Sequence, residues 1–189
     1  MAGLRAVLFD MDGTLTRPDL DFAELRRRVG APAGRDIIGH IQSLPAPQAQ
    51  QALATVEEME MESARRAQAN PGVAVLACLR DRGLRLGLVT NNHRRALDHT
   101  LERLGLRFDL TLSREDARPK PAPDLICLAL ERLGCSPAET RFVGDGAYDR
   151  QASAAAGVAY IHLAHDGRAR PGEETLFSLE ELPARLGSV

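Results

Sequence analysis

Two short segments contain closely spaced acidic residues, and each segment directly follows an apolar run. Asp10 and Asp12 lie in the first segment, and Asp145 and Asp149 lie in the second. If these carboxylates converged in the folded chain, they would repel one another strongly unless a cation lay among them. A site with few ligands, all of them oxygen atoms, suits Mg²⁺, which keeps several waters and is completed by a substrate phosphate.

Side chains that can hold a phosphoryl group lie between the two acidic segments. Thr90 and Asn91 follow another apolar run, and Lys120 lies in a proline-rich loop before a helical pattern. A hydroxyl, an amide and an ammonium group together supply hydrogen bonds and positive charge, on which phosphoryl transfer largely depends. A carboxylate can also attack phosphorus and form an aspartyl-phosphate. The residues therefore indicate a magnesium-dependent phosphoryl-transfer site.

Lys120 is the only lysine among the 24 Lys and Arg residues of the chain. A codon bias toward arginine explains this ratio without reference to function. The functional alternative is a site that needs a compact ammonium group rather than a planar guanidinium. On that interpretation, Lys120→Arg is expected to reduce activity far more than stability.

The elements that must position these residues alternate between strand and helix. Short apolar runs predict five buried strands, at Ala6–Phe9, Leu84–Val89, Phe108–Leu112, Arg141–Val143 and Val158–Leu163. Helical patterns lie between them, the first with Asn70 as its N-cap and Pro71 in its first turn, the others at His93–Leu104 and Pro123–Leu133. This alternation predicts a parallel sheet covered on both faces, which binds ligands beyond the carboxyl ends of its strands.

One stretch interrupts the alternation. Between the first strand and Asn70 the sequence shows only helical patterns, broken by glycine- and proline-containing segments. We therefore expect residues 19–70 to form a small helical insertion, and residues 1–18 and 71–189 to form the α/β core. A short helix is expected near Ser178–Leu186.

Composition excludes several classes of protein. The chain has 189 residues, 44% of them hydrophobic, with a net charge of −2, which predicts either one soluble globular unit or a core plus a small accessory domain. Its arginines are scattered among acids, so nucleic acid is not an expected partner. No segment approaches the roughly 18 to 20 apolar residues of a membrane span, and no signal peptide is evident.

The cysteines and histidines give no sign of a metal site. Cys78, Cys127 and Cys135 are odd in number and lack CxxC spacing, so we expect reduced thiols, mostly in the core, of a cytoplasmic protein. The five histidines are scattered, and each is expected to be on the surface or partly packed.

Four segments, FDMDGTLT, LVTNN, RPKPAPD and FVGDGAYD, occur in this order along the chain. Together they resemble the four motifs of the haloacid dehalogenase superfamily, and the helical insertion resembles the cap domain of that family. The likeness covers nearly the whole chain. It implies a doubly wound, Rossmann-like α/β core with a small α-helical cap inserted after the first strand.

The resemblance also implies roles for the acids of the first motif. Asp10 would be the nucleophile that accepts the phosphoryl group, with its second oxygen on Mg²⁺. Asp12 would protonate the leaving alcohol and then activate water, with its backbone carbonyl on the metal.

The other three motifs imply binding roles. Thr90 and Asn91 would hold the phosphoryl oxygens, Thr90 by its hydroxyl. Lys120 would bridge the nucleophile and the phosphate. Asp145 would bind Mg²⁺, and Asp149 would bind it or orient its waters.

The family resemblance implies hydrolysis of a small phosphomonoester, with phosphoglycolate as the leading candidate, by a monomer or homodimer acting on a phosphorylated metabolite. A phosphomutase of the β-phosphoglucomutase type remains an alternative, because the catalytic motifs are shared. Dehalogenation is disfavoured because that branch lacks the second acid, here Asp12. A non-catalytic interaction module is disfavoured because the acids and Lys120 are intact.

Overall fold

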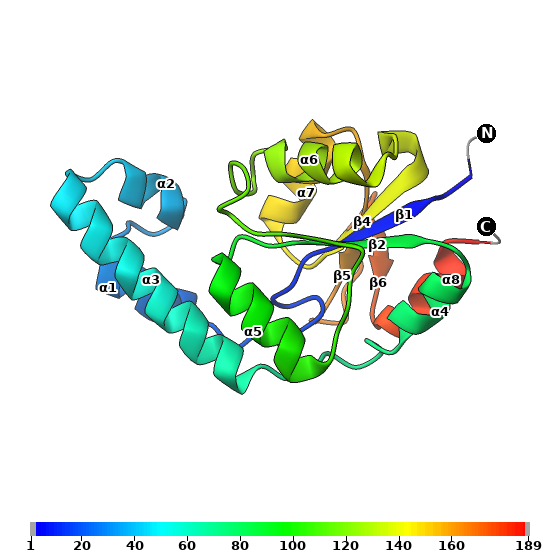
Figure 1. The fold of residues 1–189 in the computed structure, drawn as a ribbon, viewed down its shortest axis with the longest axis horizontal. Helices are drawn as coiled ribbons and strands as arrows, with labels where there is room; N and C mark the ends of the chain where they lie inside the picture. Colours follow the sequence, from blue (N-terminus) through cyan, green and yellow to red (C-terminus); the bar gives the residue numbers. More distant parts are fainter. Residues whose placement is uncertain (1–2, 188–189) are drawn as a thin grey trace.

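The computed structural model describes residues 3–187 as a helix-covered sheet with a separate group of helices at one edge (Figure 1). The sheet has six parallel strands in the order β3-β2-β1-β4-β5-β6. Their bounds are β1 (Ala6–Phe9), β2 (Arg85–Val89), β3 (Leu110–Leu112), β4 (Thr140–Gly144), β5 (Ala159–Leu163) and β6 (Glu174–Leu176). This arrangement confirms the predicted doubly wound α/β fold.

Strand β1 lies at the centre of the sheet and is buried on both faces. Val7 and Phe9 pack on one face with α4 (Val75–Asp81), α5 (Arg94–Leu104), η2 (Leu179–Glu181) and α8 (Leu182–Arg185). Ala6 and Leu8 pack on the other face, against α6 (Asp124–Leu133) and α7 (Ala147–Ala155). A short 3-10 helix, η1 (Pro137–Glu139), precedes β4. Alternate residues of a strand face opposite sides, so a continuous apolar run is what a central parallel strand requires.

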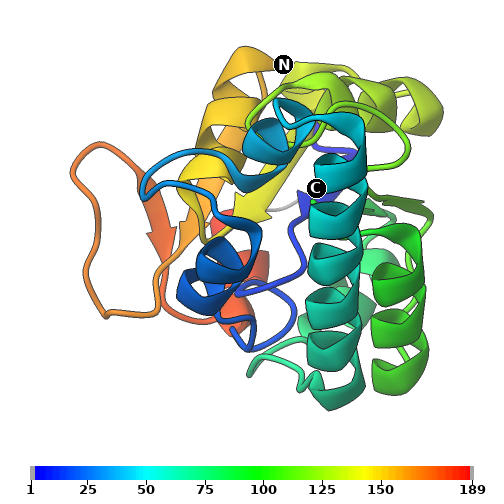
Figure 2. The same ribbon diagram turned by 90° about the vertical axis from the view of Figure 1, so that its left-hand side faces the viewer.

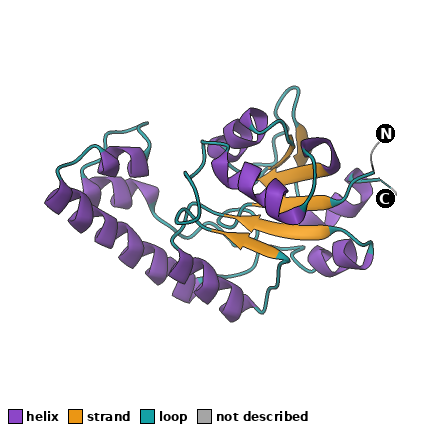
Figure 3. Cartoon of the chain, turned by 45° about the horizontal axis from the view of Figure 1, so that its top comes forward, coloured by secondary structure: helices purple, strands orange, loops and turns teal. Residues whose placement is uncertain are grey.

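Three helices form a lobe outside the sheet, which we call the helical lobe: α1 (Phe22–Val29), α2 (Ile37–Gln42) and α3 (Ala46–Arg66). They share an apolar core of their own that includes Leu25, Ile41, Val56 and Met59. Figure 3 shows the strand arrows pointing toward this lobe, which therefore lies beyond the carboxyl ends of the strands. The lobe falls within the segment 19–70 expected to be an insertion.

The helical lobe is joined to the core by two chain segments that pair with each other. Arg17 N donates to Gln68 O at 2.9 Å, and Thr16 forms an antiparallel bridge with Ala69. The C-terminal part of α3, just before this connection, packs along α5, and the two helices lie side by side in both Figure 1 and Figure 2. One helix of the lobe therefore packs directly on the core.

The structure differs from the sequence-based expectation at the start of α4. Asn70 does not cap this helix, which begins at Val75. Its side chain is buried and donates instead to Gly13 O at 3.1 Å and Thr14 O at 2.9 Å. Buried carbonyl groups need a hydrogen-bond donor, and the side-chain amide of Asn70 supplies it to these two carbonyls instead of capping the helix.

The structure has one strand more, and fewer buried cysteines, than the sequence predicts. All five expected strands are present, but β6 was missed because it has only three residues and begins with an acid. The prediction that the cysteines are mostly in the core is wrong, since Cys78 and Cys127 are exposed on the outer faces of α4 and α6 and only Cys135 is buried. The expected short helix near the end of the chain is present as η2 and α8.

Along residues 3–187, no helix combines the length and apolar character needed to cross a bilayer.

Candidate active site

Three acidic side chains meet at the carboxyl ends of β1 and β4, which are neighbours in the sheet. Asp10 directly follows β1, Asp145 follows β4, and Asp149 lies in the first turn of α7. One carboxylate oxygen from each lies within 4.8 Å of those of the other two. The backbone of Asp10 is fixed because its N–H donates to Val143 O at 2.9 Å. The parallel register of adjacent strands thus brings together acids that are far apart in sequence.

Lys120 is buried between two of these acids. Its Nζ donates to Asp10 Oδ1 at 2.5 Å, to Asp149 Oδ1 at 2.6 Å and to Val89 O at 3.0 Å. An ammonium group has three donors, so every one of them is used. The side chain of Lys120 is only 3% exposed. This geometry places the positive charge of Lys120 beside Asp10.

Asn91 holds the loop that carries Lys120. Its side-chain amide donates to Lys120 O at 2.7 Å, and its side-chain oxygen accepts from Lys120 N at 2.8 Å. The sequence suggested that this amide is free to donate to a phosphoryl oxygen, but the structure uses it on the lysine backbone instead. Thr90 differs, because its hydroxyl oxygen accepts from Asn92 N at 3.1 Å and keeps its own hydrogen to donate.

The three acids carry more negative charge than Lys120 compensates. Burial raises the pKa of Asp10 well above its ordinary value, the charges of Asp149 and Asp145 raise it further, and Lys120 opposes them. Burial and the neighbouring Asp149 raise the pKa of Asp145 to about 6. Burial lowers the pKa of Lys120, but the two acids outweigh this and hold it above its ordinary value. A divalent cation among the carboxylates would remove the imbalance.

The donor set fits Mg²⁺. All three converging groups are carboxylates, and a hard cation that prefers oxygen ligands suits them better than a metal that prefers nitrogen or sulfur. Gly13 leaves room for this arrangement, since a Cβ at its position would lie 2.1 Å from Asp145 Oδ2, and its φ of +82° favours glycine.

Metal removal is expected to make stability depend on the ionisation of Asp145. Its folded-state pKa of about 6 lies above the ordinary 3.8, so its contribution to stability is present below the ordinary value and is lost as the pH rises through about 6. Thermal unfolding in EDTA should therefore show wild type losing stability relative to Asp145→Asn between pH about 4 and about 7. Added Mg²⁺ should stabilise wild type most at the higher pH and the variant less. Parallel pH curves with no Mg²⁺ effect would contradict the metal assignment.

Asp12 lies beside this cluster with a different set of partners. Its carboxylate accepts from Asn92 Nδ2 at 2.7 Å and from Thr16 Oγ1 at 3.3 Å. Burial raises its pKa to about 6, and the charge of Glu60 contributes to the rise, although the Asn92 hydrogen bond opposes it. A carboxyl group that exchanges its proton near neutral pH can serve as both general acid and general base.

Some residues near the site were not identified from sequence. Asn92 contacts Asp12, and Glu60, His93 and Arg114 form a buried ionic cluster. The expectation that His93 is on the surface or partly packed is wrong, because it is 3% exposed and bonded to Glu60. Only Asn92 carried a signal in the sequence, through its position directly after Thr90 and Asn91.

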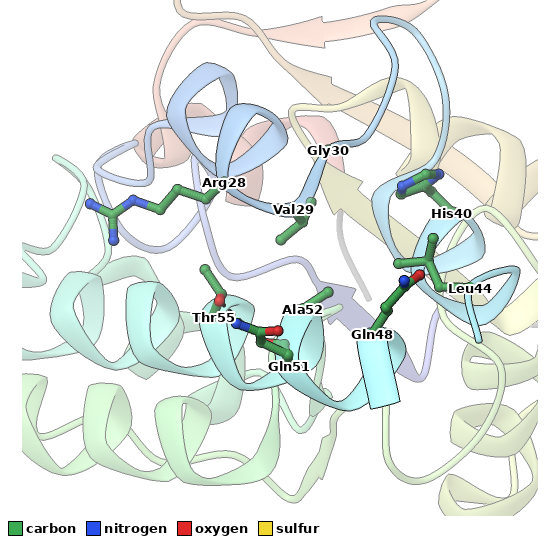
Figure 4. A pocket seen from close by; sticks show the side chains of 9 residues that line it. All are labelled: Arg28, Val29, Gly30, His40, Leu44, Gln48, Gln51, Ala52 and Thr55. Carbon is green, nitrogen blue, oxygen red and sulfur yellow. Dashed lines mark hydrogen bonds between the residues drawn. The ribbon is translucent and has the colours of Figure 1, made fainter. Parts of the chain in front are cut away.

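The helical lobe contains a pocket of its own, of about 390 Å³. Figure 4 shows side chains from α1, α2 and α3 around it. Its lining consists of Arg28, Val29, Gly30, His40, Leu44, Gln48, Gln51, Ala52 and Thr55. None of the clustered acids, Thr90, Asn91 or Lys120 lines this pocket, so it is separate from the candidate active site.

Comparison with known proteins gives consistent matches along the chain. Residues 18–163 match the model of the haloacid dehalogenase-like hydrolase family. A haloacid dehalogenase-like hydrolase domain-containing protein of Arabidopsis thaliana is 32% identical over 190 residues, covering 94% of this chain and 78% of that protein. A phosphoglycolate phosphatase of Pseudomonas putida is 29% identical over 213 residues, covering 96% of this chain and 78% of that protein.

A similar structure has also been solved. The crystal structure of a HAD family hydrolase from Deinococcus radiodurans, which contains bound phosphate and sodium, matches with a TM-score of 0.71 and 25% identity. The match covers 98% of this chain and 96% of that one.

Proposed function

The chain belongs to the haloacid dehalogenase-like hydrolase family, and on that premise we propose that it is a Mg²⁺-dependent phosphatase of small phosphomonoesters. The observation that carries this proposal is the position of Lys120, whose ammonium group bonds Asp10 and Asp149 while Asp12 stands beside them. A nucleophile, a counter-charge and an acid-base group are thereby gathered at one sheet edge, as phosphoryl transfer through a carboxylate requires.

In the first step, an oxygen of Asp10 forms a bond to phosphorus while the bond from phosphorus to the leaving oxygen breaks. Asp12 gives its proton to that leaving oxygen, so the product departs as an alcohol. The backbone N–H of Asp10 is bonded to Val143 O, which fixes the position of the residue. Lys120 binds carboxylate oxygen Oδ1 of Asp10, so the other carboxylate oxygen, Oδ2, is the one that attacks. Bound Mg²⁺ would supply positive charge to the phosphoryl oxygens.

In the second step, Asp12 accepts a proton from water, and the water oxygen attacks phosphorus. The bond between Asp10 and phosphorus breaks, which releases inorganic phosphate and restores the free carboxylate. The Thr90 hydroxyl and the Asn91 backbone N–H are the groups proposed to hold the phosphoryl oxygens, since the Asn91 side chain is bonded to Lys120. Both steps use the same two acids, so no further acid-base group is required.

The helical lobe is proposed to act as a cap. It lies beyond the carboxyl ends of the strands (Figure 3), and the acids follow two of those ends. A cap in this position excludes bulk water during the reaction and contacts the leaving group. Phosphoglycolate is our leading substrate, an inference supported by the similarity to the Pseudomonas putida enzyme.

A phosphatase screen tests the proposal. With Mg²⁺, the protein should release inorganic phosphate from p-nitrophenyl phosphate and from members of a panel of phosphoglycolate, sugar phosphates, nucleotides and phosphoamino acids. EDTA should reduce the rate by about 100-fold or more.

Two results would redirect the assignment. Phosphate transfer between positions of a sugar phosphate, dependent on a sugar bisphosphate and without net phosphate release, would favour the phosphomutase alternative. No turnover of any compound with Mg²⁺ would contradict an enzymatic role of this kind.

A further inference from the structure

Glu60 is a buried acid on a helix of the helical lobe. It lies in α3, is 4% exposed, and faces the start of α5 rather than solvent. A carboxylate at such a position loses its hydration and needs partners that donate to it. Glu60 has no role in the proposed mechanism, so the burial of its carboxylate must have another explanation.

Two residues of the core supply the partners. Arg114 Nη1 donates to Glu60 Oε1 at 2.6 Å and to Oε2 at 2.7 Å. The backbone N–H of His93 donates to Glu60 Oε2 at 3.0 Å, and His93 Nδ1 lies 2.5 Å from the same oxygen. Because a carboxylate only accepts, Nδ1 carries the proton in this contact. Both carboxylate oxygens of Glu60 therefore accept hydrogen bonds from residues that follow β2 and β3.

Arg114 in turn holds the segment that binds the catalytic groups. Its Nη1 donates to Asn91 O at 3.0 Å, and its backbone N–H donates to Asn92 O at 3.2 Å. With His93 bonded to Glu60, each residue from Asn91 to His93 has a backbone group fixed by this cluster. The side chains of Asn91 and Asn92 then fix the backbone of Lys120 and the carboxylate of Asp12.

From these contacts we propose that Glu60 is a positioning residue. It holds the loop Thr90–His93 through His93 and Arg114, and so couples the helical lobe to the groups that place Asp12 and Lys120. The catalytic meaning of this coupling rests on the proposed function, whereas the ordering of the loop does not.

Stability alone does not account for the cluster. Arg114 Nη2 is buried and has no hydrogen-bond partner within residues 3–187, and an unpaired buried donor lowers stability. An apolar pair of similar volume would pack α3 against the core at least as well as a buried ion pair does. Such a pair would not accept from His93 N or donate to Asn91 O. The polar contacts to the loop are what the charged residues provide.

The test compares three variants with wild type. Glu60→Gln keeps the shape of the side chain but removes its charge. Glu60→Met combined with Arg114→Met replaces the ion pair with apolar side chains that maintain the packing. Glu58→Gln, on an exposed position of the same helix, is the matched control. Amide hydrogen exchange at residues 91–93, resolved with overlapping peptides between residues 88 and 97, thermal unfolding, and kcat and KM for p-nitrophenyl phosphate with Mg²⁺ are measured for each.

We expect the double Met variant to stay folded with a melting temperature close to that of wild type, because apolar packing offsets the partners that His93 N and Asn91 O lose. Residues 91–93 should exchange at least about tenfold faster, and kcat should fall about tenfold or more. Glu60→Gln should also show faster exchange at residues 91–93 and a lower kcat, each to a smaller extent. Glu58→Gln should change neither quantity. Unchanged exchange in residues 91–93 of the double variant would overturn the proposal. Because exchange needs no substrate, it tests the positioning even if wild type hydrolyses nothing, a result that would count only against the proposed function. Faster exchange with unchanged kcat in an active protein would overturn the catalytic coupling.

Discussion

Asp10→Asn is expected to reduce turnover of p-nitrophenyl phosphate by roughly 1,000-fold or more, because an amide oxygen does not replace a carboxylate as the nucleophile. The loss should appear in kcat at saturating Mg²⁺. The variant should still fold, since asparagine has nearly the same shape and its side-chain oxygen can accept from Lys120 as Asp10 does.

The same substitution should not lower stability in EDTA. Burial and the charges of Asp149 and Asp145 raise the pKa of Asp10, which means that its ionised form is disfavoured in the metal-free protein. A neutral side chain relieves this repulsion, so the melting temperature should equal or exceed that of wild type. Asp166→Asn, at an exposed position, is the control. Retention of wild-type turnover by Asp10→Asn would remove the basis for a nucleophilic role.

Lys120→Met is expected to lower both activity and stability. Methionine fills most of the space but leaves Asp10, Asp149 and the carbonyl of Val89 without their donor. Removing one partner of a buried ionic group costs about 3–5 kcal/mol, so the free energy of unfolding in EDTA should fall by that order. Mg²⁺ should recover part of the loss by compensating the same carboxylates.

Two further variants, Lys120→Met with Asp10→Asn and Lys120→Arg, separate the effect of charge from the effect of side-chain size. Adding Asp10→Asn to Lys120→Met removes one of the uncompensated charges, so the double variant should be more stable than Lys120→Met alone, as chemical denaturation can measure. Lys120→Arg should also destabilise, because the side chain is 3% exposed and a larger guanidinium would overpack its site. The sequence suggested that this change affects activity far more than stability, and the burial revises that expectation. Equal stability of wild type and Lys120→Met would contradict the ionic role of Lys120.

The parts of this molecule that sequence predicts best are those encoded locally. Strand β1 is a continuous apolar run followed at once by Asp10, and the structure gives it the predicted bounds, Ala6–Phe9. The structure pairs β1 with β4 in parallel, which brings Asp145 to the same sheet edge. Local periodicity therefore predicts the strands that carry the acids, and the common direction of parallel strands places their carboxyl ends together.

Contacts between distant segments could not be predicted in the same way. Glu60 looks like any acid of a surface helix, because its partners His93 and Arg114 lie 33 and 54 residues away. Asn70 has the local features of a helix cap, but its amide meets carbonyls 57 and 56 residues earlier in the chain. In each case a buried polar group is satisfied by tertiary contacts, which override the local preference.

The covalent step is tested most directly with Asp12→Asn and p-nitrophenyl phosphate. Nitrophenolate leaves without a proton, so attack by Asp10 should proceed, but asparagine does not activate water for the second step. We expect a burst of nitrophenolate stoichiometric with the protein, followed by slow turnover, and a phosphoryl group on the peptide that contains Asp10 after acid quench. Steady turnover with no burst and no adduct on Asp10 would contradict the aspartyl-phosphate mechanism.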